Sequence, residues 1–209
     1  MAKAVTKPPT CEKCNDDGYI FFEKNGYSYS KKCDCSLKKQ QKAIWRHSGF
    51  ENLEAKHELT RISENFVKNF DSIRESKRNW VVFSGRTGCG KTTQAGLIAR
   101  ELAFRSNPVV SRIVSFFDVL REFGGLWRSF DQDRVSRDID EMFDVDLIVI
   151  DDFLKGTKPG RGNDYDVVCY LVDRLYRMKM PAIFTTESRM KNIFEFDAAT
   201  AGRIVELEE

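Results

Sequence analysis

The sequence has no long hydrophobic run and almost no excess of charge of either sign. Its 209 residues include 34 lysines and arginines and 32 aspartates and glutamates, which gives a net charge of +2. No apolar stretch approaches the roughly 20 residues that a membrane span needs, so we expect no membrane partner. A net charge this close to zero does not by itself predict nucleic-acid binding. Any basic surface for nucleic acid has to be local.

The first ten residues are polar and lack the apolar core of a secretory signal peptide. We therefore expect residues 1–10 to form a flexible tail and the protein to be cytoplasmic. In that compartment cysteines stay reduced, and they tend to bind metals or to take part in chemistry.

Four of the six cysteines form two close pairs, separated by a predicted hairpin. The Asn25-Gly26 pair is typical of a two-residue hairpin turn, and its aromatic flanks favour strands. Such a hairpin would bring the two pairs together, so that four thiolates could close a tetrahedral zinc site. We predict a zinc-binding module at residues 11–36, with two disulfides or free thiols as the alternatives. The predicted ligands are Cys11, Cys14, Cys33 and Cys35.

A basic segment follows the module, and we predict a linker helix over residues 37–50. One interpretation is a surface that tracks phosphates, with Trp45 as an aromatic that stacks on bases. The favoured interpretation is a solvated linker helix that Trp45 anchors to the core. The basic residues of this region are Lys31, Lys32, Lys38, Lys39, Lys42 and Arg46.

The most specific motif is a phosphate-binding loop of the pattern G-x-x-x-x-G-K-[ST]. Its glycines let backbone N–H groups converge on phosphate oxygens, Lys91 supplies a positive charge, and the Thr92 hydroxyl is a ligand for Mg²⁺. The apolar run before it suits a buried strand, and the residues after it have helical periodicity. The predicted nucleotide-binding residues here are Gly85, Arg86, Thr87, Gly88, Cys89, Gly90, Lys91, Thr92 and Thr93.

A second nucleotide-site signature is the apolar strand 146–150 that ends in Asp151 and Asp152. A strand that ends beside the phosphate loop would deliver Asp151 to the Mg²⁺ shell. Asp152 would then polarise the attacking water. Because aspartate is one methylene shorter than the glutamate of many related ATPases, slow hydrolysis is a consequence.

Strands and helices alternate through the rest of the chain. We predict strands at 109–116 and 181–187, and helices at 53–70, 117–123, 128–143 and 167–180, with Gly124-Gly125 ending the second helix and Cys169 in the core. This alternation predicts an α/β fold with a doubly wound parallel sheet, whose ligand binds at the carboxyl ends of the strands.

Taken together, these motifs resemble the bacterial and phage helicase loaders of the DnaC/DnaI type. The likeness rests on the hairpin with Cys11-x-x-Cys14 and Cys33-x-Cys35, the phosphate loop, the strand that ends in Asp151-Asp152, and Pro181 to Thr186. It implies that residues 51–209 form an AAA+ ATPase domain, a P-loop parallel sheet flanked by helices, without a lid subdomain. The sheet also resembles that of the related IstB-like transposition helper ATPases.

The resemblance also implies roles for single residues. Thr186 lies beside the first sensor position and would contact nucleotide, while Glu187 stands where the family commonly has asparagine. Arg203, in Gly202-Arg203-Ile204, matches the arginine finger that reaches a neighbouring subunit's site. Together with Lys91, Asp151 and Asp152, it completes the predicted catalytic set.

The function implied is ATP-dependent loading of a hexameric replicative helicase onto single-stranded DNA. The cofactors would be ATP, Mg²⁺ and Zn²⁺, the loader would self-associate through its ATP sites, and the zinc module would contact the helicase. One alternative is a transposition helper ATPase that binds duplex DNA and recruits a transposase. Another is a zinc-bearing adaptor for helicase or DNA with little ATP turnover.

Overall fold

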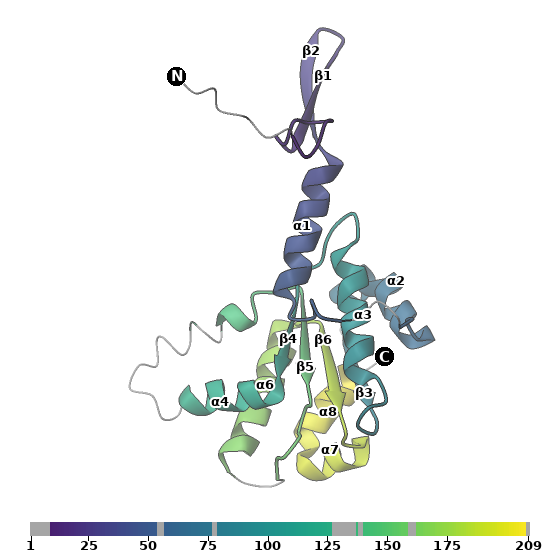
Figure 1. Ribbon diagram of the computed structural model, residues 1–209. Coiled ribbons are helices and arrows are strands. Elements are labelled where there is room, and N and C mark those ends of the chain that lie inside the picture. The colour runs from purple at the N-terminus through teal and green to yellow at the C-terminus, as the bar shows by residue number, and fades with distance from the viewer. Residues whose placement is uncertain are drawn as a thin grey trace, which may run out of the picture.

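The computed structural model describes residues 9–53, 57–76, 79–126, 137, 140–158 and 162–207. Four parallel strands form its central sheet: β3 (Trp80–Ser84), β4 (Ser111–Ser115), β5 (Leu147–Asp151) and β6 (Ala182–Thr186). Their order across the sheet is β3-β6-β5-β4 (Figure 1). The sheet follows the predicted strands within a few residues and confirms the α/β prediction.

Helices cover both faces of the sheet, because successive side chains of a strand point to opposite faces and apolar residues occur on both. One face packs Val81, Val149 and Ile183 against α2 (Arg61–Glu75) and α3 (Lys91–Ala103). The other face packs Trp80 and Phe184 against α4 (Phe116–Leu126), α6 (Asn163–Met178), α7 (Met190–Phe196) and α8 (Ala198–Leu207). Among the described residues, no helix is both long and apolar enough to cross a membrane.

Several predicted helix boundaries are wrong: α6 begins at Asn163 rather than at residue 167, and the linker helix spans Asp34–His47 rather than residues 37–50. Helix α2 begins at Arg61 rather than at residue 53, because the Thr60 hydroxyl caps it by accepting a hydrogen bond from the Ser63 N–H. Helix α4 continues through Gly124, where a Cβ atom would lie 2.9 Å from the Asn163 side chain on α6. Gly124 therefore permits close packing of two helices and does not end the first one. The predicted helix 128–143 lies mostly outside the described residues.

The N-terminal part of the chain forms an arm that projects from the sheet domain (Figure 1). Strands β1 (Tyr19–Lys24) and β2 (Tyr27–Lys32) pair as an antiparallel hairpin, and α1 (Asp34–His47) connects the hairpin to the domain. Asn25 and Gly26 both have positive φ, as the predicted hairpin turn requires. The Gln41 amide fastens α1 by donating to the carbonyls of Phe104 and Arg105, at 2.9 and 2.8 Å.

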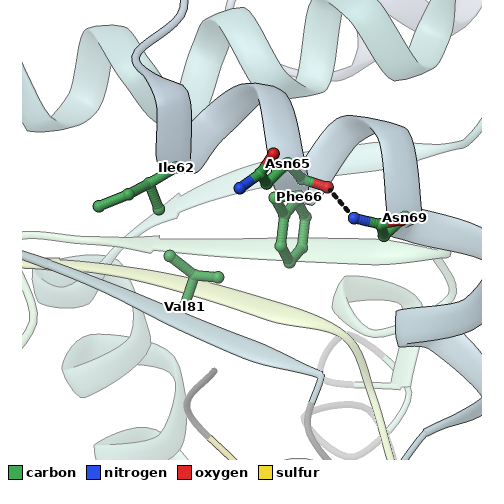
Figure 2. Close-up of a pocket in the computed structure, with 5 residues that line it drawn as sticks. All are labelled: Ile62, Asn65, Phe66, Asn69 and Val81. Carbon is green, nitrogen blue, oxygen red and sulfur yellow. Dashed lines mark hydrogen bonds between the residues drawn. The ribbon is translucent and has the colours of Figure 1, made fainter.

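A cleft of about 280 Å³ lies between α2 and the edge strand β3 (Figure 2). Ile62 on α2 lines this cleft and is 63% exposed. Asn65, Phe66, Asn69 and Val81 complete the lining. None of these residues belongs to the phosphate loop, so this cleft is separate from the predicted nucleotide site.

Candidate functional site

The phosphate loop joins the end of β3 to the start of α3 and is fixed at both ends. The Gly85 N–H donates to the Thr186 carbonyl at 3.1 Å, and the Gln94 N–H donates to the Gly90 carbonyl at 2.9 Å. Gly88 and Gly90 have φ of 77° and 90°, a conformation that side chains disfavour. Among the described residues, a Cβ at either position would meet no atom within 4 Å, so both glycines border open space, which leaves their backbone accessible to a ligand.

Lys91 and Thr92 start α3 at the mouth of this loop. The Lys91 ammonium donates to the carbonyls of Gly85 and Arg86, each at 2.9 Å. The Thr92 hydroxyl donates to Oδ1 of Asp151 at 2.7 Å, and the Thr185 hydroxyl donates to the same oxygen at 2.5 Å. The two predicted Mg²⁺ ligands, one after β3 and one at the end of β5, therefore lie side by side. A hydroxyl and a carboxylate are ligands that Mg²⁺ prefers, and the donor set fits the ion.

Asp152 follows in a tight turn with φ of 57°. Its carboxylate forms an ion pair with Lys155 at 2.9 Å, and Lys155 also lies 3.7 Å from Oε1 of Glu187. The Thr87 hydroxyl donates to that same Glu187 oxygen at 2.7 Å. The hydrogen bond and the charge of Asp152, aided by Glu187, raise the pKa of Lys155 above its usual value. Sequence reasoning missed Lys155, because no motif marks a lysine in this turn.

These groups line one cleft of about 290 Å³ at the carboxyl ends of the strands. It brings together six of the nine predicted loop residues and both predicted aspartates, with positive and negative side chains facing the same space. Its lining residues are Thr87, Gly88, Gly90, Lys91, Thr92, Thr93, Asp151, Asp152, Lys155 and Glu187. A second hollow of about 550 Å³ adjoins it, where Arg86 and Arg189 flank Thr87 and Glu187. Arg189 was not predicted either.

Five predicted nucleotide-site residues lie outside the lining of this cleft: Gly85 and Arg86, which line the adjoining hollow, and Cys89, Thr186 and Arg203. The Thr186 side chain is buried; its hydroxyl donates to the Phe153 carbonyl at 2.7 Å and accepts from the Ser188 N–H at 3.0 Å. Thr186 thus contacts the phosphate loop through its backbone carbonyl, which accepts the hydrogen bond from the Gly85 N–H. Arg203 on α8 pairs with Asp173 of α6 at 2.7 Å and lies 5.6 Å from the centre of the Tyr176 ring.

The four clustered cysteines meet at the base of the hairpin, with their sulfur atoms all within 4.8 Å of one another. The sulfurs of Cys11 and Cys33 are 3.7 Å apart, and those of Cys14 and Cys35 are 3.3 Å apart. A disulfide needs about 2.05 Å, so these cysteines are not bonded to each other. Zinc–sulfur bonds of about 2.3 Å at tetrahedral angles put sulfurs about 3.8 Å apart, so the donor set fits zinc.

Local backbone structure brings these thiols together. Asn15 and Asp16 have positive φ, and the Asp16 carboxylate accepts the N–H groups of Thr10 and Cys11 at 2.9 and 3.0 Å. Cys33 is the N-cap of α1 and Cys35 lies in its first turn, which explains the unusual one-residue gap.

Hydrogen bonds within the cluster shift the thiol pKa values. Burial opposes ionisation of Cys11, but hydrogen bonds, first of all with Cys14, lower its pKa to about 7. A hydrogen bond with Cys14 and burial raise the pKa of Cys35 to about 12. The thiols are close enough to share protons, which a bound cation would displace.

The structure also places Trp45, the basic residues of the linker helix and Cys169. Trp45 stacks on Phe50, with ring centroids 6.3 Å apart, and packs against the core that contains α2 and α3. It therefore anchors α1, as the favoured interpretation held. Lys38, Lys39, Lys42 and Arg46 are exposed on α1, and Cys169 is half-buried on α6.

Comparisons with known proteins show where this fold recurs. No protein-family model matches the chain. The phage-like element PBSX protein XkdC of Bacillus subtilis is 23% identical over 217 residues, which cover 94% of this chain and 79% of XkdC. A crystal structure of DnaI matches with a TM-score of 0.57 at 23% identity, over 80% of this chain and 91% of that one.

A crystal structure of the DnaC helicase loader matches with a TM-score of 0.55 at 14% identity, over 77% of this chain and 96% of that one. The chain is thus related in sequence to a phage-like protein, and the predicted likeness to DnaC and DnaI is confirmed at the level of the fold. This fold is a parallel four-stranded sheet flanked by helices, with a cysteine cluster in the N-terminal arm that is suited to zinc.

Proposed function

We propose that this protein is an ATPase that loads a replicative DNA helicase onto single-stranded DNA. The observation that carries the proposal is the pair formed by Thr92 and Asp151, 2.7 Å apart at the foot of an open phosphate loop. That arrangement suits Mg²⁺-bound nucleoside triphosphate. The DnaC helicase loader has the same fold, which supports a replication role and a helicase as partner.

The candidate site residues have separate tasks under this proposal. Lys91 leaves the carbonyls of Gly85 and Arg86 and binds phosphate oxygens. Thr92 and Asp151 hold Mg²⁺, which neutralises charge on the phosphates when bound. Asp152 orients the attacking water and accepts its proton. Arg203 supplies positive charge to a neighbouring subunit's site, which requires its ion pair with Asp173 to open.

The arm is suited to binding a partner protein, a part of the proposed function that does not involve the ATP site. It projects from the domain (Figure 1). Its hairpin exposes large aromatic side chains, among them Phe21 at 73% and Tyr27 at 69%. Exposed aromatics of this kind favour protein contacts. The arm is therefore the proposed helicase contact, while subunits associate through their ATP sites.

A direct test measures complex formation with the replicative helicase of the same host, by pull-down and mass measurement with and without ATP. We expect a complex with several loaders per helicase hexamer and transfer of the helicase to single-stranded DNA. Lys91→Ala should abolish ATP turnover and loading, while its zinc content stays that of the wild type.

Intact ATPase activity in Lys91→Ala would refute the nucleotide site. Absence of any helicase complex, together with filaments on duplex DNA, would instead favour a transposition helper ATPase.

A second candidate function is an adaptor that binds helicase or DNA and hydrolyses little ATP. The specific observation in its favour is that Lys155 engages Asp152, the residue that would activate water. This candidate predicts nucleotide binding without turnover stimulated by DNA or helicase, which a phosphate-release assay with each partner would detect.

A further inference from the structure

Lys155 lies between two carboxylates at the rim of the candidate ATP site. Its ammonium is 2.9 Å from Asp152 on its own turn and 3.7 Å from Glu187, which follows β6. All three side chains line the cleft that also contains Lys91 and Thr92. Lys155 is therefore a second positive charge that faces the same space as the phosphate loop.

The backbone holds this lysine in place. Asp152 and Leu154 both have positive φ, which strains residues other than glycine. The surrounding structure fixes the turn: the Asp152 N–H donates to the Thr185 hydroxyl at 3.0 Å, and the Lys155 N–H donates to the Asp152 carbonyl at 3.0 Å. Between them, Phe153 is buried against the rings of Phe116 and Phe184.

Fold stability does not account for the arrangement. The side chains of Lys155, Asp152 and Glu187 are 55, 43 and 41% exposed, and ion pairs at such exposure contribute little to stability. A strained turn that presents a solvated lysine to a cleft is instead typical of a site that binds a ligand.

The charges of the cleft point to the nature of that ligand. Asp151, Asp152 and Glu187 bring three carboxylates to the place where a polyphosphate would bind, and Lys91 and Lys155 are the lysines among its lining residues. A triphosphate carries more negative charge than a diphosphate at the end that faces these acids. Its terminal group needs a nearby cation, because an unscreened carboxylate would repel it.

We propose that Lys155 binds the terminal phosphate of a nucleoside triphosphate, in exchange for Asp152, and so distinguishes triphosphate from diphosphate. Loss of the ion pair frees the Asp152 carboxylate to accept a proton from water. Glu187, held by the Thr87 hydroxyl, keeps Lys155 over the cleft. The inference rests on the proposed ATP-binding function and names the residue that senses the terminal phosphate of that site.

The test compares Lys155→Met with Lys158→Met, an exposed lysine three residues further along that does not line the cleft. For each variant, fluorescence titration with Mg²⁺ gives the Kd of ADP and of a non-hydrolysable ATP analogue. A charge-assisted contact to phosphate is worth about tenfold in affinity. We therefore expect Lys155→Met to lower the preference for triphosphate about tenfold, with ADP affinity almost unchanged, and Lys158→Met to match the wild type.

The other outcomes separate this inference from the proposed function. Equal loss of ADP and triphosphate affinity in Lys155→Met, or no loss of either, overturns the sensing role while the ATP site stands. A wild-type chain that binds neither nucleotide overturns both. Lys155→Arg keeps the charge and should keep the preference for triphosphate; a Lys155→Arg variant that behaves like Lys155→Met would also contradict the proposal.

Discussion

In the hairpin strands β1 and β2 every side chain but one is exposed, whereas in strands β5 and β6 every side chain but one is buried. The two sheets thus depend on different forces. The core strands are held by apolar burial on both faces. A two-stranded hairpin without such burial is marginal in water, so something else has to hold it. In this chain the cysteine cluster lies at the base of the hairpin, where a bound metal ion would stabilise it.

The largest expected effect comes from removing the cluster. Cys11→Ser combined with Cys14→Ser should abolish zinc binding and unfold the hairpin, because binding of structural zinc contributes about 10–16 kcal/mol in small domains. The melting temperature of the sheet domain and its expected nucleotide binding should stay the same. Metal analysis and amide-resolved NMR measure the two regions separately.

Cys169→Ser is the matched control for this experiment, since Cys169 lies on α6 away from the cluster and should leave zinc content unchanged. If the hairpin keeps its NMR signals without metal, then the hairpin does not depend on the cysteine cluster for its stability, contrary to our expectation.

The next effect tests burial in the core. Phe184 is fully buried, with its ring 5.2 Å from that of Trp80 and 4.9 Å from that of Phe153. Phe184→Ala should lower the free energy of unfolding by about 3–5 kcal/mol, measured by urea denaturation, without loss of zinc. Phe21→Ala in the hairpin, where the ring is 73% exposed, should change it by less than about 0.5 kcal/mol. Equal effects of the two substitutions would contradict the comparison.

A smaller effect than that of Phe184→Ala is expected from a helix cap in the sheet domain. The Asp197 carboxylate accepts the Thr200 N–H at 2.6 Å, at the start of α8, and the Tyr165 hydroxyl at 2.9 Å. Asp197→Ala should lower the free energy of unfolding by about 1 kcal/mol, since helix caps contribute about that much.

The pH dependence of this cap has a defined sign. Burial opposes ionisation of Asp197, but hydrogen bonds from Thr200 and Tyr165 and the charge of Arg203 lower its pKa below 3.8. The stabilisation is therefore present above the unfolded-state pKa and is lost as pH falls through the folded-state value. The difference between wild type and Asp197→Ala should shrink below about pH 4 in urea titrations. A difference that stays constant there would show that the charge of Asp197 contributes nothing.

Much of the candidate site could be predicted because its residues are close in sequence. The loop from Gly85 to Thr92 and the strand that ends in Asp151 are continuous motifs, and the Asn25-Gly26 turn follows from local φ preferences. Lys155 and Glu187 could not be paired in the same way, because their meeting depends on two loops that follow neighbouring strands. The burial of the Thr186 side chain could also not be predicted from the residues next to it in sequence.

The sequence by itself determined the order of strands and helices, the phosphate loop and the four thiols, since these depend on residue type and short-range spacing. Only the tertiary structure decided that Gly124 lies inside a helix, because the reason is the approach of Asn163 from another helix. It also decided that Lys155 faces the phosphate loop, because parallel strands deliver residues distant in sequence to one edge of the sheet.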